Sequence, residues 1–153
     1  MDISIDSIED PAVIRLLKEH LADMQITSPP ESRHTLTIDE LKRPDVTCWV
    51  AREELSVLGC AALKELNSQN GEIKSMRTAR ESRGRGVAKA LFSTIFAEEK
   101  MRCYQSSWLE TRSTGSMPYF DQARRLYEHE GFVYCADSED SNSCYMTKRF
   151  CAD

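Results

Sequence analysis

The chain has 153 residues, of which 41% are hydrophobic and 29% are charged. Those values are typical of one globular domain with its own hydrophobic core, so we expect residues 1–153 to form a single domain. The formal net charge of −5 argues against nucleic acid as the main partner, because no broad basic surface is required.

No apolar run approaches the roughly 20 residues that a membrane-spanning helix needs. The acidic start of the chain, residues 1–6, also lacks the apolar run of a signal peptide. The six cysteines contain no Cys-x-x-Cys pair and no Cys/His spacing typical of zinc. We therefore expect a cytoplasmic protein with no membrane contact and no metal, whose cysteines are reduced and mostly buried.

The first third of the sequence predicts a strand and two helices. Ile3 and Ile5 alternate with polar residues, which indicates a short strand. Asp10-Pro11 then supplies an N-cap and a first helical residue, and apolar residues recur on one face of the helix that follows. Residues 28–32, Ser-Pro-Pro-Glu-Ser, interrupt this pattern as a loop. Residues 37–40 match a capping box that begins a short second helix.

Three consecutive strands are predicted next, over residues 47–52, 57–66 and 72–78, as an antiparallel meander. In the third strand, Ile73, Met76 and Thr78 are separated by three and then by two residues. A regular strand keeps a period of two, so this break predicts a β-bulge near Lys74-Ser75.

The remaining elements predict a β-α-β crossover and a final strand pair. A helix over 87–101 is apolar on nearly all sides, and a strand over 104–111 follows it in parallel with the strand that precedes it. A helix over 116–130 ends at Gly131, and strands over 132–135 and 144–149 close the chain. The sequence therefore predicts an α/β fold with a mixed sheet of about seven strands and about four helices.

The segment Gly71–Phe92 is the most informative stretch, because it joins a strand to a helix through a basic loop with two glycines. The N–H groups at a helix start form a ready anion site. A P-loop would require Lys-Ser/Thr where Val87-Ala88 stands, and a dinucleotide fingerprint would require a third glycine where Lys89 stands. The remaining match is to the pattern Arg/Gln-x-x-Gly-x-Gly/Ala, over residues 83–88.

That hexapeptide, placed after a bulged strand and before a helix, resembles the GNAT superfamily of acyl-coenzyme A-dependent N-acyltransferases. The segment Leu126–Phe132, LYEHEGF, resembles the LYExxGF segment of the same family. The stretches HLADM, SPPES and GEIKSMRT also resemble a bacterial subgroup, the YsnE-like acetyltransferases. The resemblance implies a GNAT-like three-layer fold with a central parallel pair that splays apart, and acetyl-CoA as the co-substrate.

Physical chemistry agrees with coenzyme A as the anion. Successive N–H groups of residues 84–88 can cradle a pyrophosphate, and glycines allow the close approach that a Cβ would hinder. Pantetheine is a chain of amides, so it can pair with the backbone of residues 76–78 like an added strand. The expected coenzyme A contacts are Met76, Arg77, Thr78, Arg83, Gly84, Arg85, Gly86, Val87 and Ala88.

The resemblance also implies roles in catalysis. Tyr127 matches the family tyrosine that donates a proton to the coenzyme A sulfur, and its helical spacing leaves a core tyrosine as the alternative. Glu72 stands where some members carry a general base, and its alternative is a solvated or salt-bridged glutamate. The N–H near Met76 matches the position that polarises the thioester carbonyl. Glu31 and His34 fall in the loop that usually shapes the acceptor pocket.

These observations predict an N-acetyltransferase in which the primary amine of a small molecule or peptide attacks the thioester directly. One alternative is a sensor that binds acyl-CoA without turnover, for which the anion site alone would suffice. Another is a nucleic-acid-binding domain, which the acidic remainder of the chain disfavours. The sequence leaves the acceptor open, and homodimers are common among similar proteins.

Overall fold

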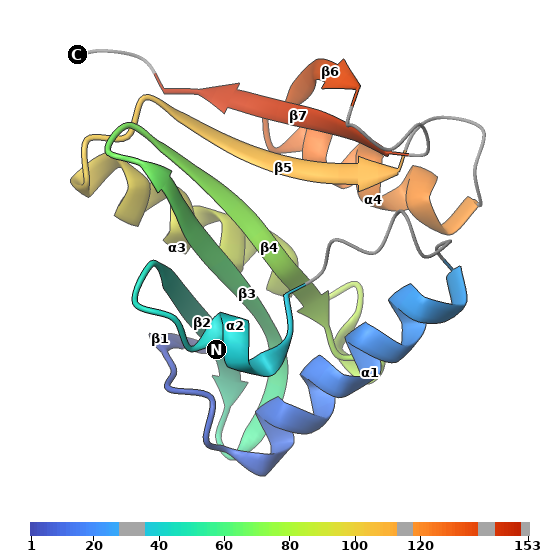
Figure 1. Ribbon diagram of the computed structural model, residues 1–153. Helices are drawn as coiled ribbons and strands as arrows, with labels where there is room; N and C mark the ends of the chain where they lie inside the picture. The colour runs from blue at the N-terminus through green and yellow to red at the C-terminus, as the bar shows by residue number, and fades with distance from the viewer. Residues whose placement is uncertain (28–35, 113–117, 138–142, 151–153) are drawn as a thin grey trace.

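The computed structural model describes residues 1–27, 36–112, 118–137 and 143–150 (Figure 1). These residues form a seven-stranded mixed sheet in the order β1-β2-β3-β4-β5-β7-β6. The strands are β1 (Asp2–Ile5), β2 (Val46–Glu53), β3 (Ser56–Asn67), β4 (Asn70–Thr78), β5 (Ser106–Arg112), β6 (Val133–Asp137) and β7 (Ser143–Arg149). The helices are α1 (Pro11–Thr27), α2 (Ile38–Leu41), α3 (Val87–Met101) and α4 (Pro118–His129), with a short 3-10 helix η2 (Arg80–Ser82) before α3. The predicted mixed α/β fold is confirmed.

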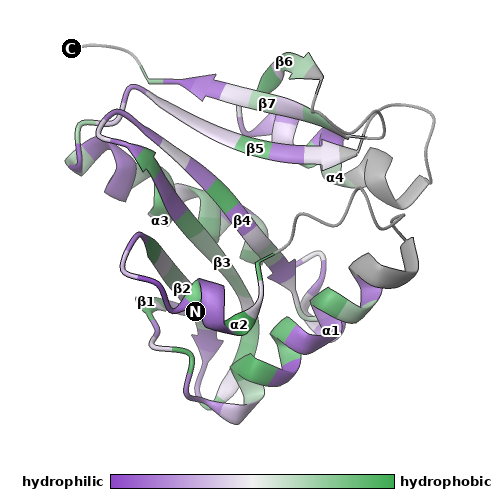
Figure 2. Cartoon of the chain, viewed as in Figure 1, coloured by the Kyte–Doolittle hydropathy of each residue, from purple (hydrophilic) through white to green (hydrophobic). Residues whose placement is uncertain are grey.

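The helices cover both faces of the sheet and make two core clusters. One cluster lies between the sheet and α3, around Leu91, Phe92 and Ile95, which are fully buried. The other lies between the sheet and the helices α1 and α2, and includes Val13 and Leu17. In Figure 2, hydrophobic residues line most of β3, whereas hydrophilic residues continue to the C-terminal end of β4. The end of β4 therefore brings polar groups into the middle of the sheet.

The central strands β4 and β5 are parallel and stay paired for only three residue pairs. Pairing begins at Asn70 and Ser106 and ends at Glu72 and Trp108. Beyond these residues the two strands diverge (Figure 1), so the C-terminal halves of β4 and β5 no longer exchange backbone hydrogen bonds. The sheet is thus split at its centre, where the resemblance predicts a splayed pair.

The predicted bulge lies on the split half of β4. Ala62 pairs with Lys74 and Cys60 pairs with Arg77, so β4 carries one more residue than β3 in this interval. Ser75 has a φ of 53°, a left-handed conformation that is uncommon for residues other than glycine. The period break in the sequence therefore identified the bulge correctly.

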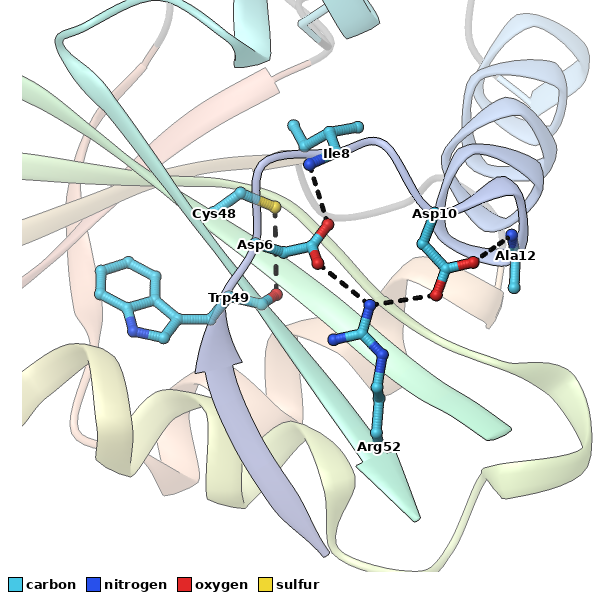
Figure 3. Close-up of polar contacts among 7 residues, drawn as sticks. All are labelled: Asp6, Ile8, Asp10, Ala12, Cys48, Trp49 and Arg52. Atoms are coloured by element: carbon cyan, nitrogen blue, oxygen red, sulfur yellow. Dashed lines mark hydrogen bonds and ion pairs between the residues drawn. The ribbon is translucent and has the colours of Figure 1, made fainter. Parts of the chain in front are cut away.

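The N-terminal connection from β1 to α1 is fixed by a charged network with Arg52 of β2 at its centre (Figure 3). The Nη2 atom of Arg52 donates to Asp6 at 3.0 Å and to Asp10 at 3.1 Å. The same two carboxylates accept backbone hydrogen bonds, Asp6 from Ile8 and Asp10 from Ala12. Asp10 is therefore an N-cap of α1, as predicted, and it also ties the start of the helix to the sheet.

Several element boundaries differ from the prediction in ways that local hydrogen bonds explain. The turn between β3 and β4 is shorter than 67–71, because β3 extends to Asn67 and β4 begins at Asn70. Strand β5 begins at Ser106 and not at Tyr104, because the Tyr104 N–H bonds to the Glu99 carbonyl at the end of α3. The capping box of α2 is present, with Thr37 and Glu40 each accepting a backbone N–H of the other.

The described cysteines are in the thiol form. Cys48, Cys60 and Cys144 are buried, while Cys103 and Cys135 are exposed; Cys151 lies outside the described residues. Burial raises the pKa of Cys48 to about 12, so this thiol stays protonated at neutral pH. In the part of the chain that the structure describes, no helix is both long and apolar enough to cross a membrane.

Glu99 is an acidic residue inside the core between α3 and the sheet. Its side chain is fully buried, and its carboxylate lies against Gly71 of β4, where an added Cβ would be 3.1 Å from Oε2. Burial raises the pKa of Glu99 to about 8, against the opposing effects of the Ser107 hydroxyl, Arg102 and Lys148. Glu99 is therefore mostly protonated at neutral pH, which avoids the large cost of a buried charge.

This buried acid predicts a pH dependence of stability. The folded protein holds the Glu99 proton more tightly than the unfolded chain, whose glutamates titrate near 4.5. The free energy of unfolding should thus fall as the pH rises from about 5 to about 8. In Glu99→Gln this loss should be reduced, as measured by urea denaturation at several pH values. Equal slopes in both proteins would contradict the assignment.

Candidate active site

The loop before α3 forms a concave stretch of backbone. Gly84 and Gly86 both have left-handed φ values, 78° and 79°, and a Cβ at either position would meet no atom within 4 Å. Glycine is therefore required here by backbone conformation and not by crowding. Gly86 is also the N-cap of α3, and no side chain caps this helix. The first N–H groups of α3 are thus available to an anion from outside the chain.

The arginines around this loop differ in their surroundings. Arg83 is exposed, and Arg85 is exposed and forms an ion pair with Glu53 of β2 at 2.8 Å. Arg77 instead is buried, and its Nη1 atom contacts Asp23 of α1 at 2.6 Å. The Arg77 side chain therefore points to the α1 side of the sheet, which leaves only its backbone for a ligand on the α3 side of β4.

Glu72 is positioned on β4 at the last pair before the strands diverge. Its neighbour Gly71 faces the α3 side, because an added Cβ there would touch Leu63 and Glu99. Successive residues of a strand face opposite sides, so Glu72 faces α1. Glu72 is nearly buried, and it forms an ion pair with Lys74 at 3.7 Å.

The environment of Glu72 favours its protonated form. Burial is the main cause that raises the pKa of this carboxyl, and the negative charge of Glu110 adds to the rise. The charges of Lys74 and Lys64 partly oppose these effects. A carboxylate with a raised pKa is a better proton acceptor than an ordinary surface glutamate.

Tyr127 lies on the other face of the sheet, near the end of α4. Its ring makes edge contacts with Phe92 and Phe132, at centroid distances of 6.0 and 6.5 Å. The side chain is half-buried against the core cluster around α3. This packing fixes the ring, so a structural role for its aromatic part and a chemical role for its hydroxyl are compatible.

The structure places some predicted residues together and separates others. Glu72 and Met76 lie on the same strand beside the split, while Tyr127 packs on the α3 side. Glu31 and His34 lie outside the described residues. No group of three or more His, Cys, Asp or Glu side chains within residues 1–27, 36–112, 118–137 and 143–150 is arranged to hold a metal ion.

Two features of this region were not foreseen from the sequence. Glu110 of β5 acts on the pKa of Glu72 across the split, and the ion pair of Arg77 with Asp23 joins β4 to α1. The sequence did contain a sign of the first feature, because Trp108 and Glu110 are two residues apart on β5 and so share a face. Glu72 pairs with Trp108, which places Glu72 on that face too. The second joins residues 54 positions apart, which no local pattern reveals.

Comparison with known proteins places this arrangement in a family. The profile of the acetyltransferase (GNAT) domain matches residues 44–134. The chain is 46% identical over 153 residues to the protein named "Uncharacterized N-acetyltransferase YsnE" of Bacillus subtilis strain 168, covering 97% of this chain and 99% of that protein. It is 38% identical to "Uncharacterized N-acetyltransferase YedL" of Escherichia coli K12, covering 90% and 85%.

Among solved structures, the PaiA N-acetyltransferase of Thermoplasma acidophilum, in complex with coenzyme A, superposes with a TM-score of 0.75. The match covers 98% of this chain and 100% of that one, at 17% identity. The chain belongs to the GNAT family of acetyltransferases and is an acyltransferase enzyme. The family and subgroup resemblances in the sequence are confirmed.

The close approach of β3 to the start of α3 gives a test of the site's architecture. A Cβ at Gly59 would lie 2.8 Å from both the Arg77 carbonyl oxygen and Cγ1 of Val87. Gly59→Ala should therefore lower the free energy of unfolding by about 1–3 kcal/mol, measured by urea denaturation. Leu55→Ala, at a side chain that is 95% exposed, is the control and should change it by less than about 0.5 kcal/mol. Wild-type stability of Gly59→Ala would contradict this geometry.

Proposed function

We propose that the protein transfers an acetyl group from acetyl-CoA to a primary amine by direct attack of the amine on the thioester. One observation carries the proposal: the parallel strands β4 and β5 separate beside a glycine-rich loop that leads into a helix without a side-chain cap. This combination supplies an anion site and an unpaired strand edge next to each other. The PaiA structure, a relative in fold, was solved with coenzyme A.

The donor fits this region by charge and by backbone geometry. The pyrophosphate would bind the N–H groups of residues 84–88, where Gly84 and Gly86 leave space and Arg83 and Arg85 add positive charge. Val87 and Ala88 contribute their backbone, because Val87 is itself buried in the core. Pantetheine would pair with the β4 backbone at Met76–Thr78, beyond the last pair with β5.

The proposed chemistry needs a neutral amine, a stabilised oxyanion and a protonated leaving thiol. Glu72 is the proposed base, acting directly or through a water, because its raised pKa brings it closer to that of an amine. The N–H of Met76 would donate to the thioester oxygen. The Tyr127 hydroxyl would donate to the sulfur from the opposite side of the sheet, since Tyr127 lies on the α3 side and Glu72 on the α1 side.

A turnover assay that detects the free thiol of released coenzyme A, with a broad panel of amines, tests the proposal. The wild type should release thiol only when an amine is present. Tyr127→Phe should lower kcat about 10- to 100-fold, because the hydroxyl is lost while the ring packing is kept. Its affinity for acetyl-CoA should remain within about twofold of wild type.

Tyr134→Phe, on the exposed strand β6, is the matched control and should turn over like the wild type. Unchanged turnover in Tyr127→Phe would remove Tyr127 from the mechanism. Binding of acetyl-CoA without thiol release for any amine would favour the alternative, a sensor of acyl-CoA.

Glu72→Gln tests the proposed base through its pH profile. The variant should lower kcat about 100-fold near neutral pH, where the amine is protonated and needs a base. The deficit should shrink as the pH approaches the pKa of the amine, about 10, because the amine then loses its proton to water. Glu54→Gln, at an exposed position, is the control. A profile parallel to that of the wild type would exclude Glu72 as the base.

A further inference from the structure

The bulge of β4 contains a buried hydroxyl with an unfilled hydrogen bond. Ser75 is 8% exposed, and its Oγ atom has no hydrogen-bond partner among the described residues. A buried polar group without a partner destabilises a protein, because it has lost its hydrogen bonds to water. The left-handed backbone of Ser75, with its φ of 53°, adds a further cost. The unpaired hydroxyl and the left-handed backbone both lower stability, which indicates that this conformation of Ser75 has a functional role.

A second unfilled donor lies two residues further along the strand. The Arg77 side chain is 5% exposed, and although Nη1 contacts Asp23, its Nε atom has no hydrogen-bond partner among the described residues. Arg77 pairs with Cys60, which belongs to the core cluster under α1 and α2, so the guanidinium lies on the α1 side. Met76 lies between the two donors and packs against the opposite cluster.

The position of these donors relates them to the proposed chemistry. Both follow Glu72, the last residue of β4 that pairs with β5, so both lie on the split half of the strand. Arg77 shares the α1 face with Glu72, and Ser75 lies between them along the strand. Only Met76 separates Ser75 from Arg77 along β4, so both donors lie at the same level of the split strand.

We propose that the Ser75 hydroxyl and the Nε–H of Arg77 bind an oxygen-bearing planar group of the acceptor, a carboxylate or an amide carbonyl. The acceptor is then an amino acid or a peptide-like amine, and simple alkylamines are poor substrates. This inference rests on the proposed function, because it assigns the α1 side of the split to the acceptor. Two hydrogen-bond donors require an acceptor atom, which an alkylamine lacks once its nitrogen is committed to the reaction.

The test compares amines that differ in this oxygen group, with kcat/KM expressed per neutral amine because a neighbouring carbonyl also lowers the pKa of the amine. One set is L-lysine, L-lysinamide and cadaverine, and the other is L-phenylalanine, L-phenylalaninamide and phenethylamine. In the thiol-release assay, kcat/KM for the better oxygen-bearing member of a set should exceed that for its decarboxylated amine by about tenfold or more. A preference for the acid identifies a carboxylate as the ligand, and a preference for the amide identifies a carbonyl.

Two variants assign the preference to Ser75. Ser75→Ala and Ser75→Gly should each reduce the preference about five- to tenfold, through KM for the acceptor, with KM for acetyl-CoA unchanged. Glycine adopts the left-handed conformation without strain, so Ser75→Gly should fold at least as well as the wild type. Ser107→Ala is the matched control, because Ser107 is another buried serine, whose hydroxyl lies beside Glu99 on the α3 side.

Calorimetric binding of the same compounds in the presence of coenzyme A separates this inference from the proposed function. Selective binding of the oxygen-bearing compounds without turnover would support the inference and overturn the function. Turnover with equal kcat/KM within each set, or an unchanged preference in both Ser75 variants, would overturn the inference alone. Neither binding nor turnover of any compound would overturn both.

Discussion

The interruption of backbone pairing between β4 and β5 is the constraint on which the rest of the structure depends. Three residue pairs hold the two strands together, and beyond Glu72 and Trp108 the facing edges have no partner strand among the described residues. Backbone N–H and C=O groups inside a protein need hydrogen-bond partners. Where the two central strands do not pair, a ligand with amide groups of its own can supply these partners. The bulge at Ser75 lies on this unpaired half of β4.

The two faces of the sheet are consequently suited to different ligands. On the α3 side, the helix without a side-chain cap and the glycine loop form the proposed anion site, and aromatic packing fixes Tyr127. On the α1 side, β4 presents charged and polar groups that are largely buried, among them Glu72 and Arg77. Two substrates that approach the split from opposite faces can meet there without competing for the same contacts.

Local patterns in the sequence were enough to predict much of this arrangement. The limits of α3, Val87–Met101, follow from a helix that is apolar on most sides and begins after Gly86, and the structure has the same limits. The bulge followed from the spacing of Ile73 and Met76. The sequence predicts that the strand after α3 begins at Tyr104, but the backbone of Tyr104 closes the end of α3 instead.

What could not be predicted depends on contacts between distant segments. The ion pair of Arg77 with Asp23 and the effect of Glu110 on Glu72 arise only when α1, β4 and β5 are brought together. The burial of Glu99 has the same origin: on a helix surface a glutamate is ordinarily exposed, and only the packing of α3 on Gly71 encloses it. The sequence around each of these side chains does not reveal that it will be buried or paired.

The N-terminus of α3, which has no side-chain cap, also bears on the stability of the folded protein. A helix start without a side-chain cap is stabilised by an anion that binds it, and such binding adds RT ln(1 + [L]/Kd) to the free energy of unfolding. Under the proposed function, coenzyme A would be this anion, and its binding would make opening of the chain to proteases less frequent. The supply of the co-substrate would therefore affect both the rate of the enzyme and its resistance to degradation.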